Sequence, residues 1–408
     1  MNVPKLRFKN EDGREFAEWT STNLGEISGN DVMYGMNAAA KPFDGKHKYI
    51  RITDINEESQ TFIPNPLCSP SGIIEEKYKL KAGDLVFART GASVGKTYLY
   101  NSDDGNLHFA GFLIKFHVKK ANSYFVFLKT QTQQYRTWVK VMSMRSGQPG
   151  INAEEYKEFK FLIPQRVEQT KIANFLTAID EKIAQLTQKH TLLTQYKKGV
   201  MQQIFSQQFR FKDEDGREFA EWEIVDLEEL AFKVNLKNRN LVLNNVLTNS
   251  ATQGIISQND YFDRDIANKN NLDGYYVVEK DDFVYNPRIS NNAPVGPIKR
   301  NKLLRGVMSP LYTVFRFKKG ELTFFEHFFE TTYWHDYMKS ISNSGARHDR
   351  MNITNENFFA LPISLPSEKE QTKIATFLTA IDDKITHTQA QLTAVKQYKQ
   401  GLLQQMFV

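Results

Sequence analysis

A near-match to a phosphate-binding loop lies between Gly91 and Thr97, which read Gly-Ala-Ser-Val-Gly-Lys-Thr. A P-loop needs four residues between its first glycine and the Gly-Lys pair, because the backbone N–H groups of that turn surround the phosphates. This stretch is one residue short, and position 90 is threonine rather than glycine. The sequence therefore predicts no nucleotide site here.

Other catalytic patterns are incomplete as well. Asn286-Pro287-Arg288 lacks the second proline and the aromatic residue of an amino-methyltransferase loop, and no GxGxxG pattern marks a site for a methyl donor or a dinucleotide. The eight histidines are scattered without metal-ligand spacing, and the single cysteine, Cys68, excludes a cysteine-rich zinc site and internal disulfides. Glu75-Glu76-Lys77 lacks the further acidic residue of a nuclease site and is interpreted as a surface turn. We predict no catalytic residue, no metal and no cofactor on this chain.

The distribution of charge favours a binding function instead. The net charge is +6, and two long tracts, 105–153 and 283–320, contain no aspartate or glutamate but many lysines and arginines. A single basic run is usually a solvated surface. Two such tracts in corresponding places are typical of a surface that follows the phosphates of nucleic acid. The sequence predicts contact with double-stranded DNA.

These tracts are framed by an internal repeat. Residues 168–183 read EQTKIANFLTAIDEKI and residues 370–385 read EQTKIATFLTAIDDKI, so the copies differ at two positions. The copies continue into matching tails, QYKKGVMQQIF at 195–205 and QYKQGLLQQMF at 397–407. A repeat of this length defines the architecture of the chain.

Heptad spacing predicts that each copy is a long helix. Apolar residues form two rows that repeat every seven residues, which is the seam of a coiled coil, and His190, Lys197 and Lys399 also fall on it. A helix of about 40 residues is roughly 60 Å long. Because the second helix ends the chain after a second domain, the two helices should pair antiparallel and bring the termini together. In the first copy the rows are Ile172, Ile179, Leu186, Leu193, Val200 and Leu176, Ile183, His190, Lys197, Ile204.

Each repeat opens with the same nine residues, EDGREFAEW, at 11–19 and 214–222. Asp-Gly between apolar flanks predicts a hairpin, interpreted as packing the helix end onto its domain. Between opener and helix the two inserts diverge almost completely. We predict an α+β chain with an internal pseudo-two-fold repeat, in which two small α/β domains are joined by two long antiparallel coiled-coil helices. The predicted segments are domains at 1–163 and 207–365 and helices at 164–206 and 366–408.

The 408 residues, 40% of them hydrophobic, can form more than one core, and the mean hydropathy of -0.51 indicates a soluble protein. There is no charged-then-apolar leader and no apolar run near the roughly 20 residues of a membrane span. We expect a cytoplasmic protein without membrane contact.

The tandem of variable domains separated by near-identical helices resembles the specificity subunit of type I restriction–modification enzymes. The most specific elements are EQTKIANFLTAIDEKI, the QYKKGVMQQIF tail and AGDLVFARTGASVG at 82–95. The resemblance implies two target recognition domains, each reading one half of a bipartite asymmetric DNA site, with helices that set the spacer. It also implies a non-catalytic subunit that recruits two methyltransferase (modification) subunits and restriction/translocase subunits. S-adenosylmethionine, ATP and Mg would then bind those partners.

Candidate DNA-binding residues follow from side-chain chemistry, because arginine suits guanine, asparagine or glutamine suits adenine, and lysine suits phosphate. Unit two departs from the AGDLVFARTGASVG element, with Asn286-Pro-Arg-Ile-Ser-Asn-Asn292 in its place. An alternative function is a coiled-coil scaffold whose end domains bind protein partners, and the salt dependence of DNA binding would separate the two. The candidates are Arg89, Ser93, Lys96, Lys119, Lys120, Arg136, Lys140, Arg145, Ser146 and Gln148 in the first domain, and Arg288, Asn291, Asn292, Lys299, Arg300, Lys302, Arg347, His348 and Arg350 in the second.

Overall fold

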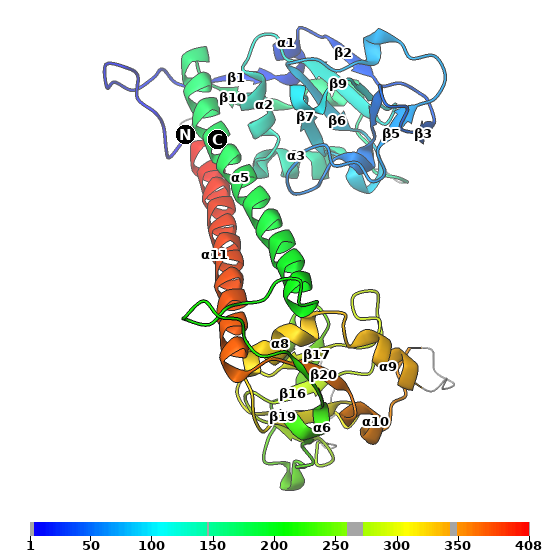
Figure 1. Cartoon of the computed structure of the whole chain (residues 1–408). Coiled ribbons are helices and arrows are strands. Elements are labelled where there is room, and N and C mark those ends of the chain that lie inside the picture. The colour runs from blue at the N-terminus through cyan, green and yellow to red at the C-terminus, as the bar shows by residue number, and fades with distance from the viewer. Residues whose placement is uncertain (1–3, 145–146, 259–271, 343–348, 408) are drawn as a thin grey trace. The chain divides into compact units, whose positions relative to one another are not determined.

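The structure, a computed structural model, describes residues 4–144, 147–258, 272–342 and 349–407. Two compact units form: unit 1 comprises residues 1–187 with 390–408, and unit 2 comprises residues 188–389. Two long helices, α5 (Arg166–Phe205) and α11 (Glu368–Met406), are each shared between the units. Each unit therefore contains one variable insert and half of each long helix, as Figure 1 shows by the colour along the chain.

The insert of unit 1 is a mixed fold of short strands and helices. Its strands are β1 (Thr20–Asn23), β2 (Val32–Tyr34), β3 (Ala40–Pro42), β4 (Lys48–Ile50), β5 (Cys68–Pro70), β6 (Asp84–Ala88), β7 (Thr97–Leu99), β8 (Leu107–Phe109), β9 (Leu113–His117) and β10 (Lys160–Ile163). Its helices are α1 (Leu24–Ser28), α2 (Ser123–Lys129), α3 (Gln133–Met142) and α4 (Ala153–Lys157), with 3-10 turns η1 (Ile52–Asp54), η2 (Glu76–Tyr78), η3 (Gly91–Ser93) and η4 (Ser102–Asp104).

The insert of unit 2 is built in the same way. Its strands are β11 (Glu223–Asp226), β12 (Ala231–Lys233), β13 (Leu247–Ser250), β14 (Gly254–Ser257), β15 (Tyr276–Val278), β16 (Phe283–Tyr285), β17 (Ile298–Arg300), β18 (Gly306–Met308), β19 (Thr313–Phe317) and β20 (Pro362–Leu365). Its helices are α6 (Leu227–Leu230), α8 (Leu322–Glu330), α9 (His335–Ile341) and α10 (Asn355–Phe359), with the 3-10 turn η5 (Arg239–Leu241).

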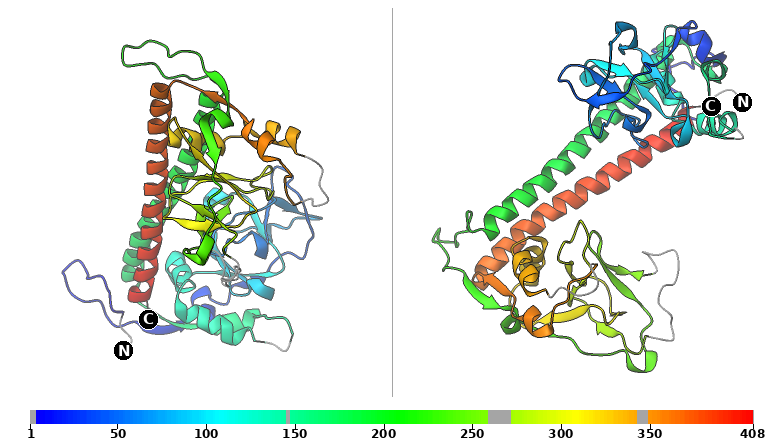
Figure 2. Two further views of the ribbon diagram at one scale, coloured as in Figure 1. Left: turned by 90° about the horizontal axis from the view of Figure 1, so that it is seen from below. Right: turned by 90° about the vertical axis from the view of Figure 1, so that its right-hand side faces the viewer.

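The two inserts share a sheet topology despite their unlike sequences. Unit 1 has the antiparallel four-stranded order β2-β9-β6-β7, and unit 2 has β12-β19-β16-β17. In both, a strand after the opener pairs with the strand that leads into the long helix, β1 with β10 and β11 with β20. Figure 2 shows the sheets from two further directions. The α+β fold with an internal repeat is confirmed by this correspondence.

A buried aspartate at the start of the central strand anchors each sheet. Asp84 accepts a hydrogen bond from the backbone N–H of Lys81 and lies 2.8 Å from Nδ1 of His117. Asp282 accepts one from the N–H of Glu279 and pairs with Arg316 at 2.6 Å. Both carboxylates are inaccessible to solvent. A buried charge requires a partner. His117 and Arg316, which pair with these aspartates, belong to the two acid-free tracts, so part of the basic charge of the tracts serves the fold.

The long helices pair antiparallel, as predicted. In unit 1, Ile172 and Leu176 from the start of α5 share a core cluster with Leu402 and Met406 from the end of α11. In unit 2, the end of α5 packs on the start of α11 through the equivalent set Val200, Ile204, Ile374 and Leu378. Both termini belong to unit 1, where the backbone N–H of Leu6 donates to the carbonyl of Gln405.

The seam lysines are neutralised across the helix pair. Lys399 of α11 lies 2.7 Å from Asp180 of α5, and Lys197 of α5 lies 2.7 Å from Asp382 of α11. Asp180 and Asp382 are equivalent positions of the repeat. The two ion pairs therefore obey the same pseudo-two-fold relation as the sequence, and they explain how lysine is accommodated on a seam.

Each opener forms a hairpin, and an arginine just before it is hydrogen-bonded to the start of a long helix. Arg7 forms a double hydrogen bond with the buried Glu168, and Arg210 does the same with Glu370. Gly13 and Gly216 have φ angles of 75° and 77°, which the predicted Asp-Gly turns require. The predicted hairpins are present, and the interpretation that they pack on the helix agrees with these contacts.

One buried lysine distinguishes the two units. Lys129 at the end of α2 lies within 6 Å of the rings of Trp19, Phe161 and Phe407, whereas Phe328 occupies the equivalent place beside Phe205 in unit 2. Burial lowers the pKa of Lys129 to about 7. The unfolded chain therefore binds this proton more strongly than the folded chain between pH 7 and 10.5, so folding stability rises with pH across that window.

We expect Lys129→Met to stabilise unit 1. The substitution removes a charge that is costly to bury. The fall in pKa from 10.5 to about 7 is 3.5 units, which at about 1.4 kcal/mol each limits the gain to about 5 kcal/mol. Loss of the contacts that the ammonium makes in the folded chain should reduce it to the order of 2 kcal/mol. The gain should be largest below pH 7 and shrink toward pH 10.5. Thermal unfolding as a function of pH measures it, with the exposed Lys120→Met as the matched control; a gain independent of pH would contradict this explanation.

Candidate nucleic-acid interface

Two predicted DNA-binding segments of unit 1 lie side by side. The loop after β6 is joined to the segment before α4 by hydrogen bonds from Gly91 N–H to the carbonyl of Pro149 and from Ile151 N–H to the carbonyl of Arg89. Gln148 reaches the same loop, since a Cβ on Gly91 would lie 3.0 Å from its Nε2 atom. The structure therefore brings Arg89, Ser93 and Gln148 together. Arg145 and Ser146 lie outside the described residues.

The near-P-loop is a different structure from a phosphate-binding loop. Strand β7 rather than a helix follows Lys96, and the Thr97 hydroxyl is buried against Thr130. A Cβ on Gly95 would lie 2.5 Å from Val139, so α3 packs directly on the loop. A P-loop presents its amides at a helix N-terminus. The loop at 91–97 therefore lacks the geometry of a P-loop, and the absence of a nucleotide site stays a prediction.

Arg89 is held in place by aromatic side chains. Its guanidinium carbon lies 5.3 Å from the ring centroid of Tyr34 and 5.8 Å from that of Phe112, and its Nε donates to the carbonyl of Gly111. Tyr34 accepts a hydrogen bond from the N–H of Ala153. Among the described residues Nη1 and Nη2 have no acceptor, so they are available to a ligand.

Arg89 also lines a half-open cavity of about 620 Å³. Tyr34, Asn37, Arg51 and Phe112 contribute to its walls. Tyr34 and Phe112 were missed by sequence reasoning because Tyr34 ends β2 and Phe112 precedes β9, and only the pairing of β2 and β6 with β9 brings them to Arg89. What identifies Tyr34 and Phe112 as candidates in the structure is that both rings are exposed to solvent beside the guanidinium of Arg89.

The equivalent loop of unit 2 follows β16. Ile289 N–H donates to the carbonyl of Asp349, and Met351 N–H donates to that of Pro287, which repeats the pattern of unit 1. By this register Pro287 corresponds to Arg89. Arg288, Asn291 and Asn292 are exposed on this loop, and Arg350 lies opposite Arg288 on the paired segment. Arg347 and His348 lie outside the described residues.

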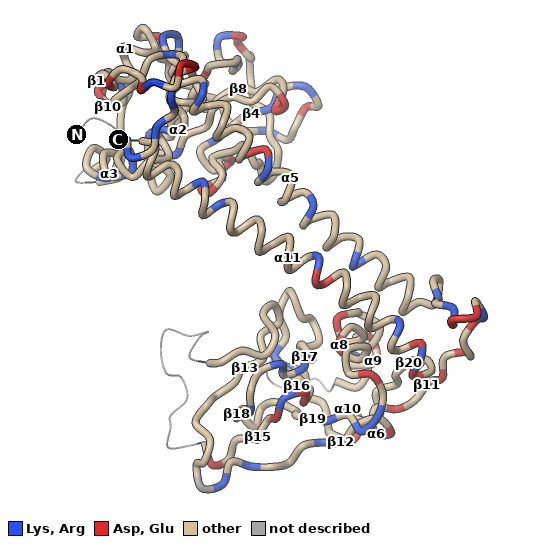
Figure 3. The backbone as a smooth tube through the Cα atoms, turned by 90° about the vertical axis from the view of Figure 1, so that its left-hand side faces the viewer, with Lys and Arg blue, Asp and Glu red and all other residues tan. Residues whose placement is uncertain are grey.

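Several basic candidates are engaged by acidic side chains. Lys96 lies 3.7 Å from Glu57, Lys119 lies 3.0 Å from Asp31, and Arg350 lies 3.5 Å from its neighbour Asp349. Lys120, Arg136 and Lys140 are exposed, and among the described residues they, Arg288 and Lys299 have no ion-pair partner. Figure 3 shows basic and acidic residues interspersed along the backbone of each unit. Two of these unpaired cations, Arg136 and Lys140, lie one turn apart on α3.

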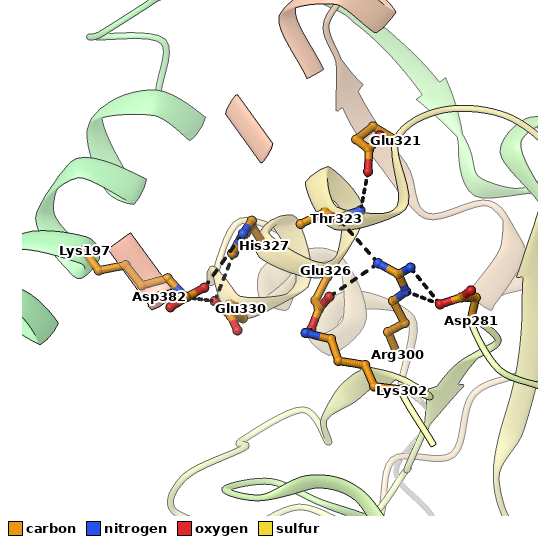
Figure 4. Close-up of polar contacts among 10 residues, drawn as sticks. All are labelled: Lys197, Asp281, Arg300, Lys302, Glu321, Thr323, Glu326, His327, Glu330 and Asp382. Atoms are coloured by element: carbon orange, nitrogen blue, oxygen red, sulfur yellow. Dashed lines mark hydrogen bonds and ion pairs between the residues drawn. The ribbon is translucent and has the colours of Figure 1, made fainter. Parts of the chain in front are cut away.

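Arg300 and Lys302 take part in a network inside unit 2 (Figure 4). Arg300 contacts Asp281 at 2.7 Å and Glu326 at 3.7 Å, and Lys302 contacts Glu326 at 2.7 Å. Arg300 is mostly buried, so its charge ties β17 to α8. The side chain of Lys302 is exposed although it is paired with Glu326.

The same figure shows how the long helices join the second insert. Lys197 lies between Asp382 of α11 and Glu330 of α8, 2.8 Å from the latter, and His327 approaches Glu330 at 3.4 Å. Burial alone would raise the pKa of Glu330, but His327 and Lys197 lower it to about 2. In unit 1, Gln131 and Tyr124 contact Lys399 and Asp180 at the corresponding place. These charges position the insert on the helices.

Within the described ranges no three histidine, cysteine, aspartate or glutamate side chains gather as a metal site. The described helices include none that is long and apolar enough to cross a membrane. The features that remain for function are the paired loops on each insert and the surfaces of the helices.

The chain matches the family of the type I restriction modification DNA specificity domain twice, over residues 17–195 and 220–397. It is 24% identical over 352 residues to the MjaX type I restriction enzyme specificity subunit of Methanocaldococcus jannaschii, with 80% of this chain and 78% of that protein covered. The crystal structure of a type I restriction-modification S subunit from M. genitalium is similar, with a TM-score of 0.60, 15% identity and coverage of 100% of this chain and 99% of that one.

The HsdS subunit of Thermoanaerobacter tengcongensis aligns over 98% of this chain and 99% of its own, at 16% identity and a TM-score of 0.45. The two family matches cover most of the chain, one in each repeat. The chain therefore belongs to the type I restriction modification DNA specificity family. Its function is DNA sequence recognition within a type I restriction–modification system, and it is not itself catalytic.

Proposed function

We propose that each insert reads one half of a bipartite, asymmetric DNA site, and that the long helices set the spacing between the halves and dock two methyltransferase subunits. The observation that carries this proposal is the pair of loops in equivalent places on one shared frame. Arg89, Gln148 and their neighbours stand on one loop pair, and Arg288, Asn291 and Asn292 on the other. The helices and openers are nearly identical in the two repeats, whereas the loop residues differ, and this combination suits two half-sites of unlike sequence.

The chemistry of the loops supports major-groove reading. Arg89 is oriented by Gly111, Tyr34 and Phe112 and offers two Nη groups, which can bond the O6 and N7 acceptors of guanine. Asn291 and Asn292 are exposed amides, which suit adenine. The exposed Lys120, Arg136 and Lys140 would contact phosphates, which contribute affinity without sequence information.

Salt dependence of binding tests the proposed function. The chain, assembled with its modification subunits, should bind duplex DNA with an affinity that falls steeply as salt rises, because each neutralised phosphate releases counterions.

Arg89→Ala should relax recognition at one half-site only, with the exposed Lys160→Ala as a control on the same domain. An affinity for DNA that changes neither with salt concentration nor with DNA sequence would favour the alternative function, a scaffold for protein partners. Methyl transfer, ATP hydrolysis and cleavage should require the partner subunits.

A length change in the helices tests the proposed spacer role. Inserting four residues at Gln188 with four more at Ala390 adds about 6 Å to each helix and slightly more than one complete turn. At about 3.4 Å per base pair, the recognised spacer should lengthen by one or two base pairs while both half-sites stay the same. Sequencing of methylated sites measures the spacer. Altered half-sites with an unchanged spacer would refute the role.

A further inference from the structure

The cavity beside Arg89 has an aromatic wall that the fold of unit 1 leaves open. Tyr34 and Phe112 both line this cavity, and the two residues are 42% and 56% exposed. Leaving a large ring in water forgoes the free energy that its burial would contribute to folding. Single exposed rings are common, but two rings on the wall of one cavity form a surface that suits an apolar group of a ligand.

Hydrogen bonds fix both rings relative to Arg89. The backbone N–H of Arg89 donates to the carbonyl of Phe112 at 3.0 Å, and the hydroxyl oxygen of Tyr34 accepts from the N–H of Ala153 at 3.1 Å. The segment that contains Ala153 is itself bonded to the loop, because the N–H of Ile151 donates to the carbonyl of Arg89 at 2.9 Å. A base bound by Arg89 would therefore have its neighbour placed against the two rings.

The charge inside the cavity argues against a phosphate as the ligand. A second lining arginine, Arg51, donates from Nε and Nη2 to the two carboxylate oxygens of the buried Asp54, at 2.8 and 2.7 Å. The charge of Arg51 is thus balanced inside the protein, whereas Arg89 has no ion-pair partner among the described residues. A phosphate would meet one unbalanced cation and two aromatic rings, which leaves most of its oxygens without donors.

The combination of a guanidinium and two rings is specific to unit 1. Extending the matched strand registers of the two sheets places three residues of unit 2 at the positions of Tyr34, Arg89 and Phe112, namely Asn235, Pro287 and Leu311. None of the three carries a guanidinium or an aromatic ring. Because the two inserts share their sheet topology, the difference lies in the side chains, as expected for a device that reads only one half-site.

We propose that this cavity binds the C5-methyl group of a thymine in the base pair next to the guanine that Arg89 reads. Hydrogen-bonding groups dominate the major groove, and the thymine methyl is the apolar group that a base presents there. Successive base pairs are about 3.4 Å apart, so the neighbour of the guanine lies within reach of rings whose centroids are 5.3 and 5.8 Å from the guanidinium carbon. The inference rests on the proposed function and specifies a second base of the half-site that unit 1 reads.

Deoxyuridine tests this contact, because it pairs as thymine does but lacks the methyl group. Duplexes carry the motif identified by sequencing methylated sites, with each thymine of the first half-site replaced in turn by deoxyuridine. The chain assembled with its modification subunits should lose about fourfold in affinity when the thymine beside the guanine is replaced, at constant salt. This factor corresponds to the roughly 0.8 kcal/mol that burying one methyl group contributes. Fluorescence anisotropy of the labelled duplex measures the affinity.

Variants at Phe112 connect the effect to the cavity. Phe112→Ala should bind the thymine and deoxyuridine duplexes equally while still requiring the guanine, and Phe112→Leu, which keeps an apolar side chain, should retain part of the preference for thymine. The matched control is Ile73→Ala, which removes an apolar side chain that is 87% exposed in the same insert. This control should preserve the fourfold preference in full.

Three outcomes overturn the inference: a first half-site without a thymine beside a guanine, an affinity that no deoxyuridine beside the guanine changes, or a thymine preference that survives in Phe112→Ala. Failure of the proposed function gives a different result. In that case Arg89→Ala leaves recognition of the first half-site unchanged, whatever the deoxyuridine duplexes show.

Discussion

Replacing residues 20–163 with the corresponding insert of another specificity subunit should change one half of the recognised site and leave the other half intact. The reason is that the insert forms a closed unit: β1 pairs with β10, and the Arg89 and Gln148 segments lie between them. Residues outside this span, including Arg7 and Glu168, hold the frame and are the same in both repeats. Loss of recognition at the first half-site should be complete, because no reading residue of that half remains.

The exchange is measured by sequencing methylated sites in cells that also contain the modification subunit. The reciprocal exchange of residues 223–365 is the matched control, and it should change only the other half. Changes in both halves, or in neither, would contradict the assignment of one half to each insert. A swap that starts after β1 should fold poorly, because it separates two paired strands.

Glu370→Ala should destabilise unit 2 by about 3–5 kcal/mol, the usual cost of removing one member of a buried ion pair. Glu370 is inaccessible to solvent and accepts hydrogen bonds from Arg210 at 2.9 Å and from Nε1 of Trp222 at 3.1 Å. Removing the carboxylate leaves the indole N–H of Trp222 without this acceptor, and the guanidinium of Arg210 keeps only Glu221 and the carbonyls of Phe219 and Ala220. Because whole domains are stable by only about 5–15 kcal/mol, unit 2 should unfold at a clearly lower temperature.

Thermal unfolding followed by hydrogen exchange locates this loss. Amides of β11, β16 and α8 should exchange faster in Glu370→Ala, while those of β6 and β9 should be unchanged. Glu368→Ala, two residues earlier on the exposed start of the same helix, is the control, with an expected cost below about 1 kcal/mol. Equal loss in both variants would show that the ion pair does not anchor the opener.

The long helices and the repeat could be predicted from the sequence because heptad rows and identical segments are local patterns. The sequence also indicated the hairpins, because Asp-Gly between apolar flanks has few alternatives. The common sheet topology of the inserts could not be predicted, because only short stretches such as 83–87 and 281–285 can be matched between them. Pairing of β6 with β9 depends on contacts far apart in the chain, which composition does not encode.

The basic tracts illustrate the limit for the site. Their net charge was evident from the sequence, but Lys115, Arg300 and Arg316 form ion pairs with aspartates, whereas Lys120 and Arg136 are exposed without an ion-pair partner among the described residues. Whether a cation is free depends on acidic residues from other segments, such as Asp84 and Asp282. In the same way, the loop after β6 could be proposed from its residues, while Tyr34 and Phe112 could be added only from the structure.

Sequencing of methylated DNA from cells expressing this chain with its modification subunit tests the central claim most directly. Recognition by two unlike inserts predicts a single modified motif of two different half-sites separated by a fixed spacer. In the Arg89→Ala variant the second half-site should be unchanged and the first relaxed. A palindromic motif, a continuous motif, or a motif unaffected by exchange of either insert would contradict the claim.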